Sequence, residues 1–308
     1  MLEKKSHRFG LIGTITRDVI TQASGLVQSG LGGILYQAAG LCGLDQDVSL
    51  YTNVGQDLLP QVNSVVDRWP TCDQAGMEIV SGPGNRVFLR YPEQGERVEV
   101  LESHVPPLRP DRVLANLPRT GFLILVMNSG FDITLPDWRR IVSRARCPVW
   151  LDIHSLALTQ ELHAARRYRS LPEWREWAEG VTYLQANWME VGAMLGESGR
   201  IPSGEGLGRF KKAALDLEIK GVFITLGPEG VLVMTPGSSR RTASPMAGEV
   251  VDTTGCGDIF CAGTAALLST GADPAEAAGF GAELAAEAAG VSGIEQTFER
   301  IRNRVFYA

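Results

Sequence analysis

Residues 252–258, with the sequence DTTGCGD, combine hydroxyls, glycines and carboxylates directly before an apolar helical pattern. Gly255 and Gly257 allow a tight turn and a close approach to a ligand. The first turn of a helix presents unpaired N–H groups that can hold a phosphate. We expect Thr253 and Thr254 to cap the helix, which leaves Asp258 to accept a proton from an alcohol. The stretch therefore predicts phosphoryl transfer to a hydroxyl; a helix start with a favourable acidic residue is the plainer alternative.

Two groups near the N-terminus suit a polyol. Asp18 follows the first strand-like run, where its carboxylate can accept hydrogen bonds from two hydroxyls; a solvated turn aspartate is the alternative. Gly32 and Gly33 precede an apolar helical pattern and leave room for a ligand beside the backbone, although a flexible turn has the same sequence.

Two groups in the C-terminal half suit a nucleotide. Asn187 and Glu190 share one face of a helix start, where Asn can contact phosphate and Glu can hold hydrated magnesium; a capping box has the same spacing. Thr225, Gly227 and Gly230 lie between two strands and suit phosphate contact, although a simple β-turn is equally compatible. The sequence contains neither the Walker-type phosphate loop nor the G-x-G-x-x-G dinucleotide fingerprint.

Short β-branched runs alternate with helical patterns along most of the chain. Strands are predicted at 9–15, 48–53, 122–127, 149–153, 181–185, 222–226 and 231–234. Helices are predicted at 33–42, 58–67, 136–145, 188–195, 206–218, 257–269 and 274–289. This alternation predicts an α/β fold with a parallel sheet covered on both faces and ligands beyond the carboxyl ends of the strands.

One region interrupts the alternation. Three strand-like runs at 77–81, 86–91 and 97–101 are separated by the turn sequences GPGN and PEQG. They predict an antiparallel insertion that covers a site, or a hairpin without a role.

The composition limits the class of protein. The 308 residues contain 29 basic and 35 acidic residues, a net charge of −6, and we find no basic run, which argues against nucleic acid or an anionic membrane as a partner. The five cysteines form no C-x-x-C pair, which favours reduced thiols in a cytoplasmic protein. Neither a membrane-spanning run nor a secretory signal is predicted in the sequence.

In this order, the motifs resemble the PfkB/ribokinase family of sugar and nucleoside kinases, from about residue 9 to about residue 293. The most specific match is residues 252–258, whose final Asp is the catalytic base in the family and whose glycine loop is the anion hole. The segment 13–18, the pair Gly32-Gly33, N-x-x-E at 187–190, T-x-G-x-x-G at 225–230 and VGQD at 54–57 are similar to further family motifs.

The resemblance implies a three-layer α/β/α Rossmann-like domain over residues 1–308, with a small β lid formed by about 14–33 and 76–103. Asp258 would be the base, with Gly255, Cys256 and Gly257 as the anion hole. The remaining implied site residues are Asp18, Gly32, Gly33 and Gln37 for the acceptor, and Asn187, Glu190, Thr225, Gly227, Gly230, Asp252 and Thr253 for the nucleotide. The implied cofactors are ATP and Mg²⁺, the latter held by Glu190 through water. A monovalent cation such as K⁺ and a homodimer through the lid are also common in the family.

Two residues depart from the family pattern. Gln37 replaces the usual Asn, which points to an unusual acceptor, and Cys256 replaces the usual Ala between the glycines. We expect an ATP-dependent kinase acting on a primary alcohol of a sugar or sugar-like molecule. A nucleoside kinase with Tyr36, Phe88 and Tyr91 around the base, and a non-catalytic sugar or nucleotide sensor, remain alternatives.

Overall fold

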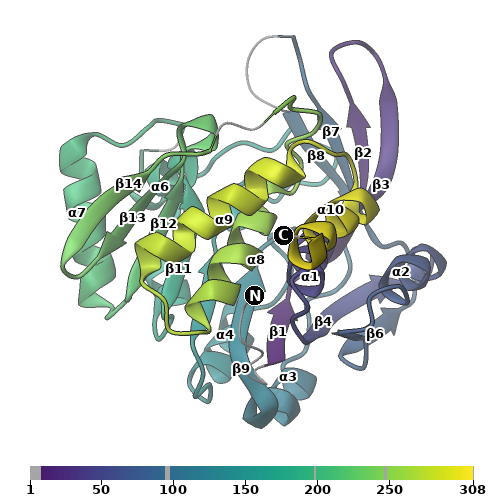
Figure 1. Ribbon diagram of the computed structural model, residues 1–308, viewed down its shortest axis with the longest axis horizontal. Helices are drawn as coiled ribbons and strands as arrows, with labels where there is room; N and C mark the ends of the chain where they lie inside the picture. Colours follow the sequence, from purple (N-terminus) through teal and green to yellow (C-terminus); the bar gives the residue numbers. More distant parts are fainter. Residues whose placement is uncertain (1–7, 94–97, 198, 246–247, 308) are drawn as a thin grey trace.

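The computed structural model describes residues 8–93, 98–197, 199–245 and 248–307. Its centre is a mostly parallel sheet with helices on both faces, and a second, smaller sheet stands beside it (Figure 1). The α/β prediction is therefore confirmed, including the small separate sheet.

The described central sheet contains parallel and antiparallel strands. Its strands are β1 (Arg8–Ile12), β4 (Val48–Gly55), β5 (Cys72–Asp73), β6 (Met77–Val80), β9 (Thr120–Val126), β10 (Val149–Asp152), β11 (Tyr183–Asn187), β12 (Gly221–Thr225), β13 (Val231–Thr235) and β14 (Ser238–Thr242). The order is β14-β13-β12-β11-β10-β9-β1-β4-β5, with β6 also paired to β4. Only β13 and β14 run antiparallel to their neighbours among these described strands, so the carboxyl ends of the others meet at one edge.

Helices fill both faces of this sheet. They are α1 (Leu35–Gly43), α2 (Leu59–Val66), α3 (Asp111–Asn116), α4 (Leu135–Val142), α5 (Trp174–Ala178), α6 (Trp188–Met194), α7 (Gly204–Asp216), α8 (Cys256–Leu268), α9 (Pro274–Ala288) and α10 (Ile294–Tyr307), with short 3-10 helices η1 (Leu117–Arg119), η2 (His154–Ala157) and η3 (Gly227–Glu229).

The alternation of side chains along β9 shows how the layers form. Phe122 and Ile124 belong to a core shared with α1, α8, α9 and α10, whereas Leu123 and Leu125 belong to a core shared with α4, α6 and α7. Successive residues of a strand point to opposite faces, so one apolar run supplies both cores. In Figure 1, α8 and α9 lie across the near face of the sheet.

The second sheet, which we call the lid sheet, contains β2 (Ile15–Thr21), β3 (Val27–Gly33), β7 (Asn85–Arg90) and β8 (Val98–Ser103). Its order is β3-β2-β7-β8. The central pair β2–β7 is parallel, and the two outer pairs are antiparallel. Ile20, Val87, Leu89 and Leu101 form its own small core.

Most predicted elements agree with the observed ones within a few residues, but two predictions are wrong. The run predicted at 77–81 is β6, which pairs in parallel with β4 and so belongs to the central sheet, not to an antiparallel insertion. The glycines that follow it do not close a hairpin; they carry the chain into the lid sheet, where the N–H of Gly84 donates to Asp57 Oδ1 at 2.7 Å. Residues 94, 95 and 97 of the predicted insertion lie outside the described residues.

The second correction concerns the N-terminal run. The strand predicted at 9–15 is divided between two sheets, because β1 ends at Ile12 and β2 begins at Ile15. Asp18 therefore lies inside β2 and not in a turn after a strand. Gly32 and Gly33 likewise end β3 instead of forming a flexible turn.

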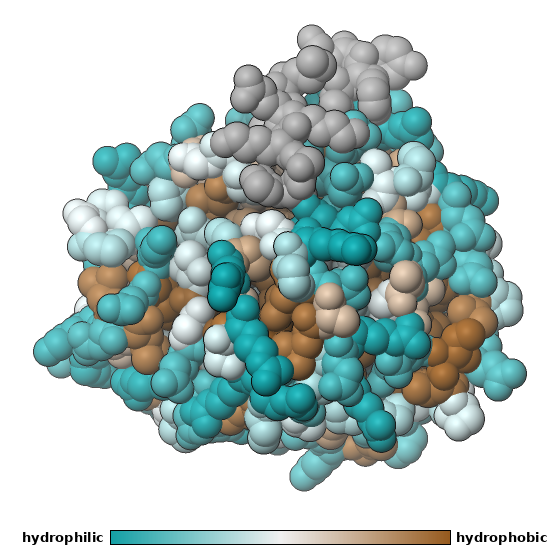
Figure 2. Space-filling model, turned by 90° about the horizontal axis from the view of Figure 1, so that it is seen from below, coloured by the Kyte–Doolittle hydropathy of each residue, from teal (hydrophilic) through white to brown (hydrophobic). Residues whose placement is uncertain are grey.

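The surface agrees with the composition. On the face shown in Figure 2, hydrophilic residues predominate and hydrophobic ones form small separate groups. None of the described helices combines the length and the apolar character needed to cross a lipid bilayer.

Candidate active site

The glycine turn predicted from the sequence begins α8. Gly255 precedes the helix with a φ of 78°, a left-handed conformation that favours glycine. A Cβ at this position would lie 2.3 Å from the ring of Tyr36, so the turn also requires a residue without a side chain.

The start of α8 carries no side-chain cap in the described structure, so the expected capping by Thr253 or Thr254 is wrong. The backbone closes the turn instead, because the N–H of Cys256 donates to the carbonyl of Thr253 at 3.2 Å. Asp252 Oδ1 accepts a hydrogen bond from the N–H of Thr254 at 2.8 Å and fixes the approach to the helix. A helix leaves its first N–H groups without intrahelical acceptors, so this start suits an anion.

Asp258 lies in the first turn of α8 and is held from α1. Gln37, fully buried in α1, donates Nε2–H to Asp258 Oδ1. Gln37 Oε1 is buried without a hydrogen-bond partner among the described atoms. The sequence placed Gln37 among the acceptor contacts; the structure places it against the predicted base, where it orients the carboxylate.

A pocket lies between the lid sheet and the carboxyl edge of the central sheet; we call it the lid pocket. The residues predicted for chemistry that line it are Asp18, Gly33, Gly255 and Asp258. Residues far apart in the sequence are thus brought together on three elements, β2, β3 and α8.

The glycine pair shapes the lid side of this pocket. Asp18 is 8% exposed, and a Cβ on Gly32 would lie 2.0 Å from its Oδ2, so any side chain at 32 would displace the carboxylate. Gly33 has a φ of 65°, which favours glycine where β3 turns into α1. The two glycines therefore let Asp18 lie flat against β3.

The polar residues of the lid pocket that the sequence analysis missed include Glu99, Asn128 and His154. Asn128 follows β9 and His154 follows β10, so their position beyond the carboxyl ends of parallel strands is a signal that could have found them. Glu99 lies on β8 and offers no such signal.

An acidic group lies beneath the lid pocket. Asp152, at the end of β10, is 4% exposed. Burial, and then the nearby charges of Glu190 and Asp258, raise its pKa well above the ordinary value. The carboxylates thus repel one another at the centre of the site, an arrangement common at functional sites.

Asn187 and Glu190 form the capping box that was the plainer reading of their spacing. Asn187 Oδ1 accepts from the N–H of Glu190 at 2.9 Å, and Glu190 Oε2 accepts from the N–H of Asn187 at 2.7 Å. Asn187 Nδ2–H also donates to Glu190 Oε1 at 2.6 Å. Among the described residues, no group of three or more His, Cys, Asp or Glu side chains is arranged to hold a metal ion. Because both Glu190 oxygens accept hydrogen bonds, contact with a cation through water fits this geometry better than direct ligation.

A second pocket, the α8–α9 pocket, lies on the other side of the glycine turn. It brings together the predicted residues Thr225, Gly227, Gly230, Cys256 and Gly257. Its apolar lining is Val231, Phe260, Ala282 and Ala285. Small and apolar side chains next to glycine N–H groups fit the base and phosphates of a nucleotide.

Cys256 is a small residue of the turn and not a reactive thiol. Burial, then Asp252 and Asp258, raise its pKa to about 12. Its thiol donates to the carbonyl of Ala285 at 3.5 Å. A thiol that stays protonated at neutral pH is a poor nucleophile.

The aromatic residues suggested for a nucleobase do not form a slot. Val87 and Leu89 of β7 line the lid pocket, so Phe88 between them points to the opposite face of the lid sheet, where it is 37% exposed. Tyr91 contacts Thr254 through its hydroxyl at 3.2 Å. Tyr36 does line the pocket; burial, followed by the charges of Asp18, Asp252 and Asp258, raises its pKa above the ordinary value.

Comparison with known proteins agrees with this geometry. Residues 164–299, which include the glycine turn and the N-x-x-E motif, match the family model described as pfkB family carbohydrate kinase. This match covers less than half of the chain, which over that part is similar to the pfkB family of carbohydrate kinases. No curated protein sequence matches the chain significantly.

Solved structures of ribokinases and of a nucleoside kinase share the fold. Arabidopsis thaliana ribokinase complexed with ribose and ATP is 17% identical with a TM-score of 0.76, covering 99% of this chain and 100% of that one. Cryptococcus neoformans ribokinase in complex with ADP is 17% identical with a TM-score of 0.74, covering 97% and 100%. Burkholderia thailandensis nucleoside kinase in complex with inosine is 16% identical with a TM-score of 0.72, covering 97% and 96%. These neighbours include both sugar and nucleoside kinases.

Proposed function

We propose that this protein is a kinase of the pfkB family that uses ATP to phosphorylate a primary alcohol of a sugar or sugar-like molecule. The observation that carries the proposal is the position of Asp258. It lines the lid pocket from the first turn of α8, whose preceding turn also lines the α8–α9 pocket. A base and a set of backbone donors thus face the point where an acceptor and a phosphate donor would meet.

The acceptor would bind in the lid pocket. Asp18, with the backbone at Gly32 and Gly33, accepts and orients its hydroxyls. Asp258 takes the proton of the reacting hydroxyl as the oxygen forms its bond to phosphorus. Gln37 holds the Asp258 carboxylate in position through its amide.

The donor would bind in the α8–α9 pocket. ATP supplies the γ-phosphoryl group there, and ADP leaves as the bond to the β-phosphate oxygen breaks. The N–H groups of Gly255 and Gly257 stabilise the developing charge, and the N–H of Cys256 contributes less because it already donates to Thr253. Thr225, Gly227 and Gly230 line the donor side.

Cations complete the proposal. Glu190, supported by Asn187, would hold Mg²⁺ through water, since its oxygens already accept hydrogen bonds. Asp252 and Thr253 would shape the nucleotide side of the turn; Asp252 Oδ2 accepts from Ser292 Oγ at 2.9 Å. A monovalent cation such as K⁺ near this loop remains a further prediction.

We further propose that residues 1–308 act as one kinase domain whose lid comprises about 14–33 and 76–103. Closure of the lid would exclude water from the transferred phosphoryl group. Contacts between two lids would account for a homodimer.

The test is release of ADP from ATP and Mg²⁺ with a panel of sugars and nucleosides, comparing wild type with Asp258→Asn. We expect kcat to fall by about 10²–10⁴-fold, because general-base catalysis is lost. The affinity for ATP, measured by calorimetry, stays within about threefold because the backbone donors remain. Asp216→Asn, on the exposed end of α7, is the matched control.

Near-normal turnover in Asp258→Asn would overturn the base assignment. ATP binding without turnover on any acceptor would instead favour a nucleotide sensor on the same fold.

A further inference from the structure

Among the side chains of the lid pocket that the proposed reaction does not use are a carboxylate and an imidazole. Asp18 and Asp258 have roles, but Glu99 from the lid sheet and His154 from η2 also line the pocket. Glu99 and His154 would therefore contact a part of the acceptor other than the reacting hydroxyl.

Glu99 faces into the pocket because of its register in β8. It pairs with Leu89 of β7, and both residues line the pocket. Glu99 is only 7% exposed. Burying a carboxylate costs free energy unless a partner compensates its charge. A buried carboxylate that lines a pocket therefore suggests a role in binding a ligand.

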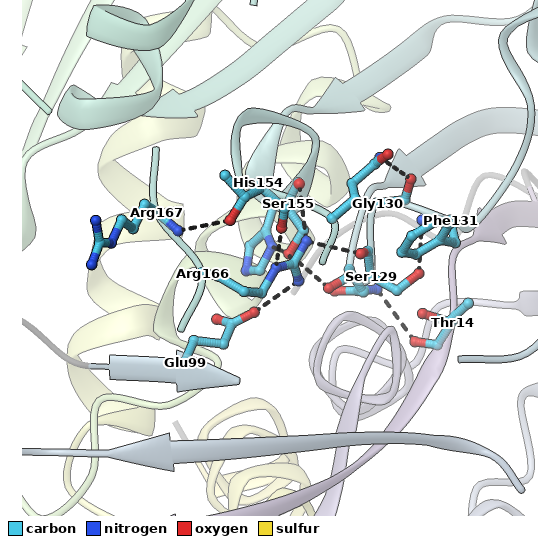
Figure 3. Close-up of polar contacts among 12 residues, drawn as sticks. Thr14, Glu99, Ser129, Gly130, Phe131, His154, Ser155, Arg166 and Arg167 are labelled. Carbon is cyan, nitrogen blue, oxygen red and sulfur yellow. Dashed lines mark hydrogen bonds and ion pairs between the residues drawn. The ribbon is translucent and has the colours of Figure 1, made fainter. Parts of the chain in front are cut away.

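The partner of Glu99 is Arg166, whose side chain is fully buried (Figure 3). Arg166 Nη1 donates to Glu99 Oε1 at 2.9 Å. The backbone N–H of Arg166 also donates to the carbonyl of Glu99 at 2.8 Å. The side chain and the backbone of Glu99 are therefore both fixed by one residue.

Arg166 is itself fixed by the core. Its Nη2 donates to the carbonyl of Ser129 at 2.9 Å, its Nε to the carbonyl of Thr159 at 3.0 Å, and its Nη1 to Ser155 Oγ at 3.2 Å. Figure 3 shows Glu99, Ser129 and Ser155 around the guanidinium of Arg166. Such a network holds the Glu99 carboxylate in a set position before a ligand binds, which favours selective recognition.

His154 lies beside this network. Its φ of 35° is rare for a residue other than glycine, and its Nδ1 is 2.9 Å from Ser155 Oγ. Unusual backbone conformations of this kind are often kept at ligand sites. The imidazole lines the same pocket as the Glu99 carboxylate.

The charges of the lid pocket are of one sign. Its lining contains the carboxylates Asp18, Glu99 and Asp258, and no Lys or Arg side chain among the described lining residues. Arg166 compensates Glu99 from behind and does not line the pocket. A carboxylate or phosphate on the acceptor would be repelled, whereas hydroxyls would find acceptors on several sides.

The aromatic content of the pocket is also low. Tyr36 is the only Phe, Tyr or Trp among the described lining residues. Its ring is packed against Gly255. The remaining apolar surface comes from Val87 and Leu89, which suit the carbon skeleton of a sugar or cyclitol better than a stacked base.

We infer that the acceptor is an uncharged polyol, without an acidic group or a nucleobase, and that Glu99, positioned by Arg166, is its specificity-determining residue. This inference rests on the proposed function and names the acceptor class of the same site.

The first experiment compares acceptors that share a skeleton: D-ribose, D-ribonate and D-ribose 5-phosphate; D-glucose and D-gluconate; myo-inositol; and the nucleosides inosine and uridine. We expect turnover with at least one neutral polyol and a kcat/KM at least about 100-fold lower for its matched acid. A preference for an acid, a sugar phosphate or a nucleoside would overturn the inference.

Binding is measured separately by calorimetry, so that the two proposals can fail independently. Neutral polyols that bind while their matched acids do not, without any turnover, would count against the kinase reaction but support the inference. Binding of no neutral polyol at concentrations up to tens of millimolar would overturn the inference.

The second experiment uses Glu99→Gln, which preserves the shape and an acceptor for Arg166. We expect KM for the neutral acceptor to rise by about tenfold or more, kcat to stay within about threefold, and the discrimination against the matched acid to shrink by about tenfold. The KM for ATP should not change.

Glu102→Gln is the control, because Glu102 lies on the same strand, is only partly buried and pairs with Arg86 at 3.0 Å. It should leave all these constants unchanged. If Glu99→Gln lowers turnover equally for every acceptor, or leaves the discrimination unchanged, Glu99 is only structural and the inference is wrong.

Discussion

The two pockets of this protein share one turn but differ in almost every chemical respect. Gly255 and Asp258 line the lid pocket, whereas their neighbours Cys256 and Gly257 line the α8–α9 pocket. The lid pocket is rich in carboxylates, and the α8–α9 pocket is lined by small and apolar side chains. The start of α8 therefore separates the lid pocket, whose carboxylates accept hydrogen bonds, from the α8–α9 pocket, which can admit an anion.

This difference shows that neighbouring residues of one turn can serve different pockets, according to the side of the turn on which each lies. Backbone donors can serve a phosphate only where carboxylates do not compete for them. Keeping the acids on the lid side leaves the helix start free of like charge toward the α8–α9 pocket.

The largest predicted effect comes from altering the shared turn. Gly255→Ala places a side chain in a left-handed conformation, which costs about 1–2 kcal/mol, and a Cβ 2.3 Å from Tyr36 would also force the turn to move. We expect kcat to fall by about 10²-fold, since backbone donors lose their alignment. Binding of both substrates should weaken in calorimetry.

Gly237→Ala is the matched control, because a Cβ there would have no atom within 4 Å. If Gly255→Ala weakens only one substrate, the two pockets do not depend on a common turn.

A smaller effect is expected from filling one side alone. Ala285→Leu inserts a larger side chain into the α8–α9 pocket, so KM for ATP should rise roughly tenfold while acceptor binding stays unchanged. Ala286→Leu, on the same helix but outside the lining of that pocket, serves as the control. Steady-state kinetics with ATP and the acceptor varied in turn would measure the KM for each substrate in both variants. A rise in the acceptor KM alone would assign the nucleotide to another place.

The smallest effect concerns stability. The pKa of Asp152 is raised in the folded state, first by burial. A raised carboxyl pKa contributes stability that is complete below the unfolded pKa and is lost as pH rises through the folded pKa. Asp152→Asn should therefore have a higher free energy of unfolding than wild type at alkaline pH, with the difference narrowing near about pH 4.

Urea denaturation at several pH values measures this difference, with Asp216→Asn at the end of α7 as an exposed control. A difference in unfolding free energy between Asp152→Asn and wild type that is constant with pH would mean that the pKa of Asp152 is not raised in the folded protein.

The sequence predicted most of the central sheet and the glycine turn, because these depend on local signals. Strands such as β9 and β12 are short apolar runs, and α8 begins at a distinctive glycine pattern. The assignment of strands to sheets was less predictable. β6 has the alternation of a lid strand, yet it pairs with β4, since nothing local specifies the partner of a strand.

The acceptor side was the hardest part to predict. Glu99 stands between Val98 and Val100, an alternation that normally places the acid in solvent and the valines inside. The structure shows the opposite alternation, in which Glu99 and Leu101 are buried and Val98 and Val100 are only partly buried. The cause is Arg166, whose contact with Glu99 spans 67 residues and so leaves no trace in a local pattern.

The backbone pairing at Arg166 also determines how the lid sheet can move. Val100 forms an antiparallel bridge with Ala165, and the N–H of His163 donates to Leu101 at 2.9 Å, so β8 is joined to the core along its outer edge. The opposite edge strand, β3, has an exposed outer half. We therefore expect the lid sheet to be held most firmly along β8 and least firmly along β3, so that amide hydrogens of β3 exchange before those of β8.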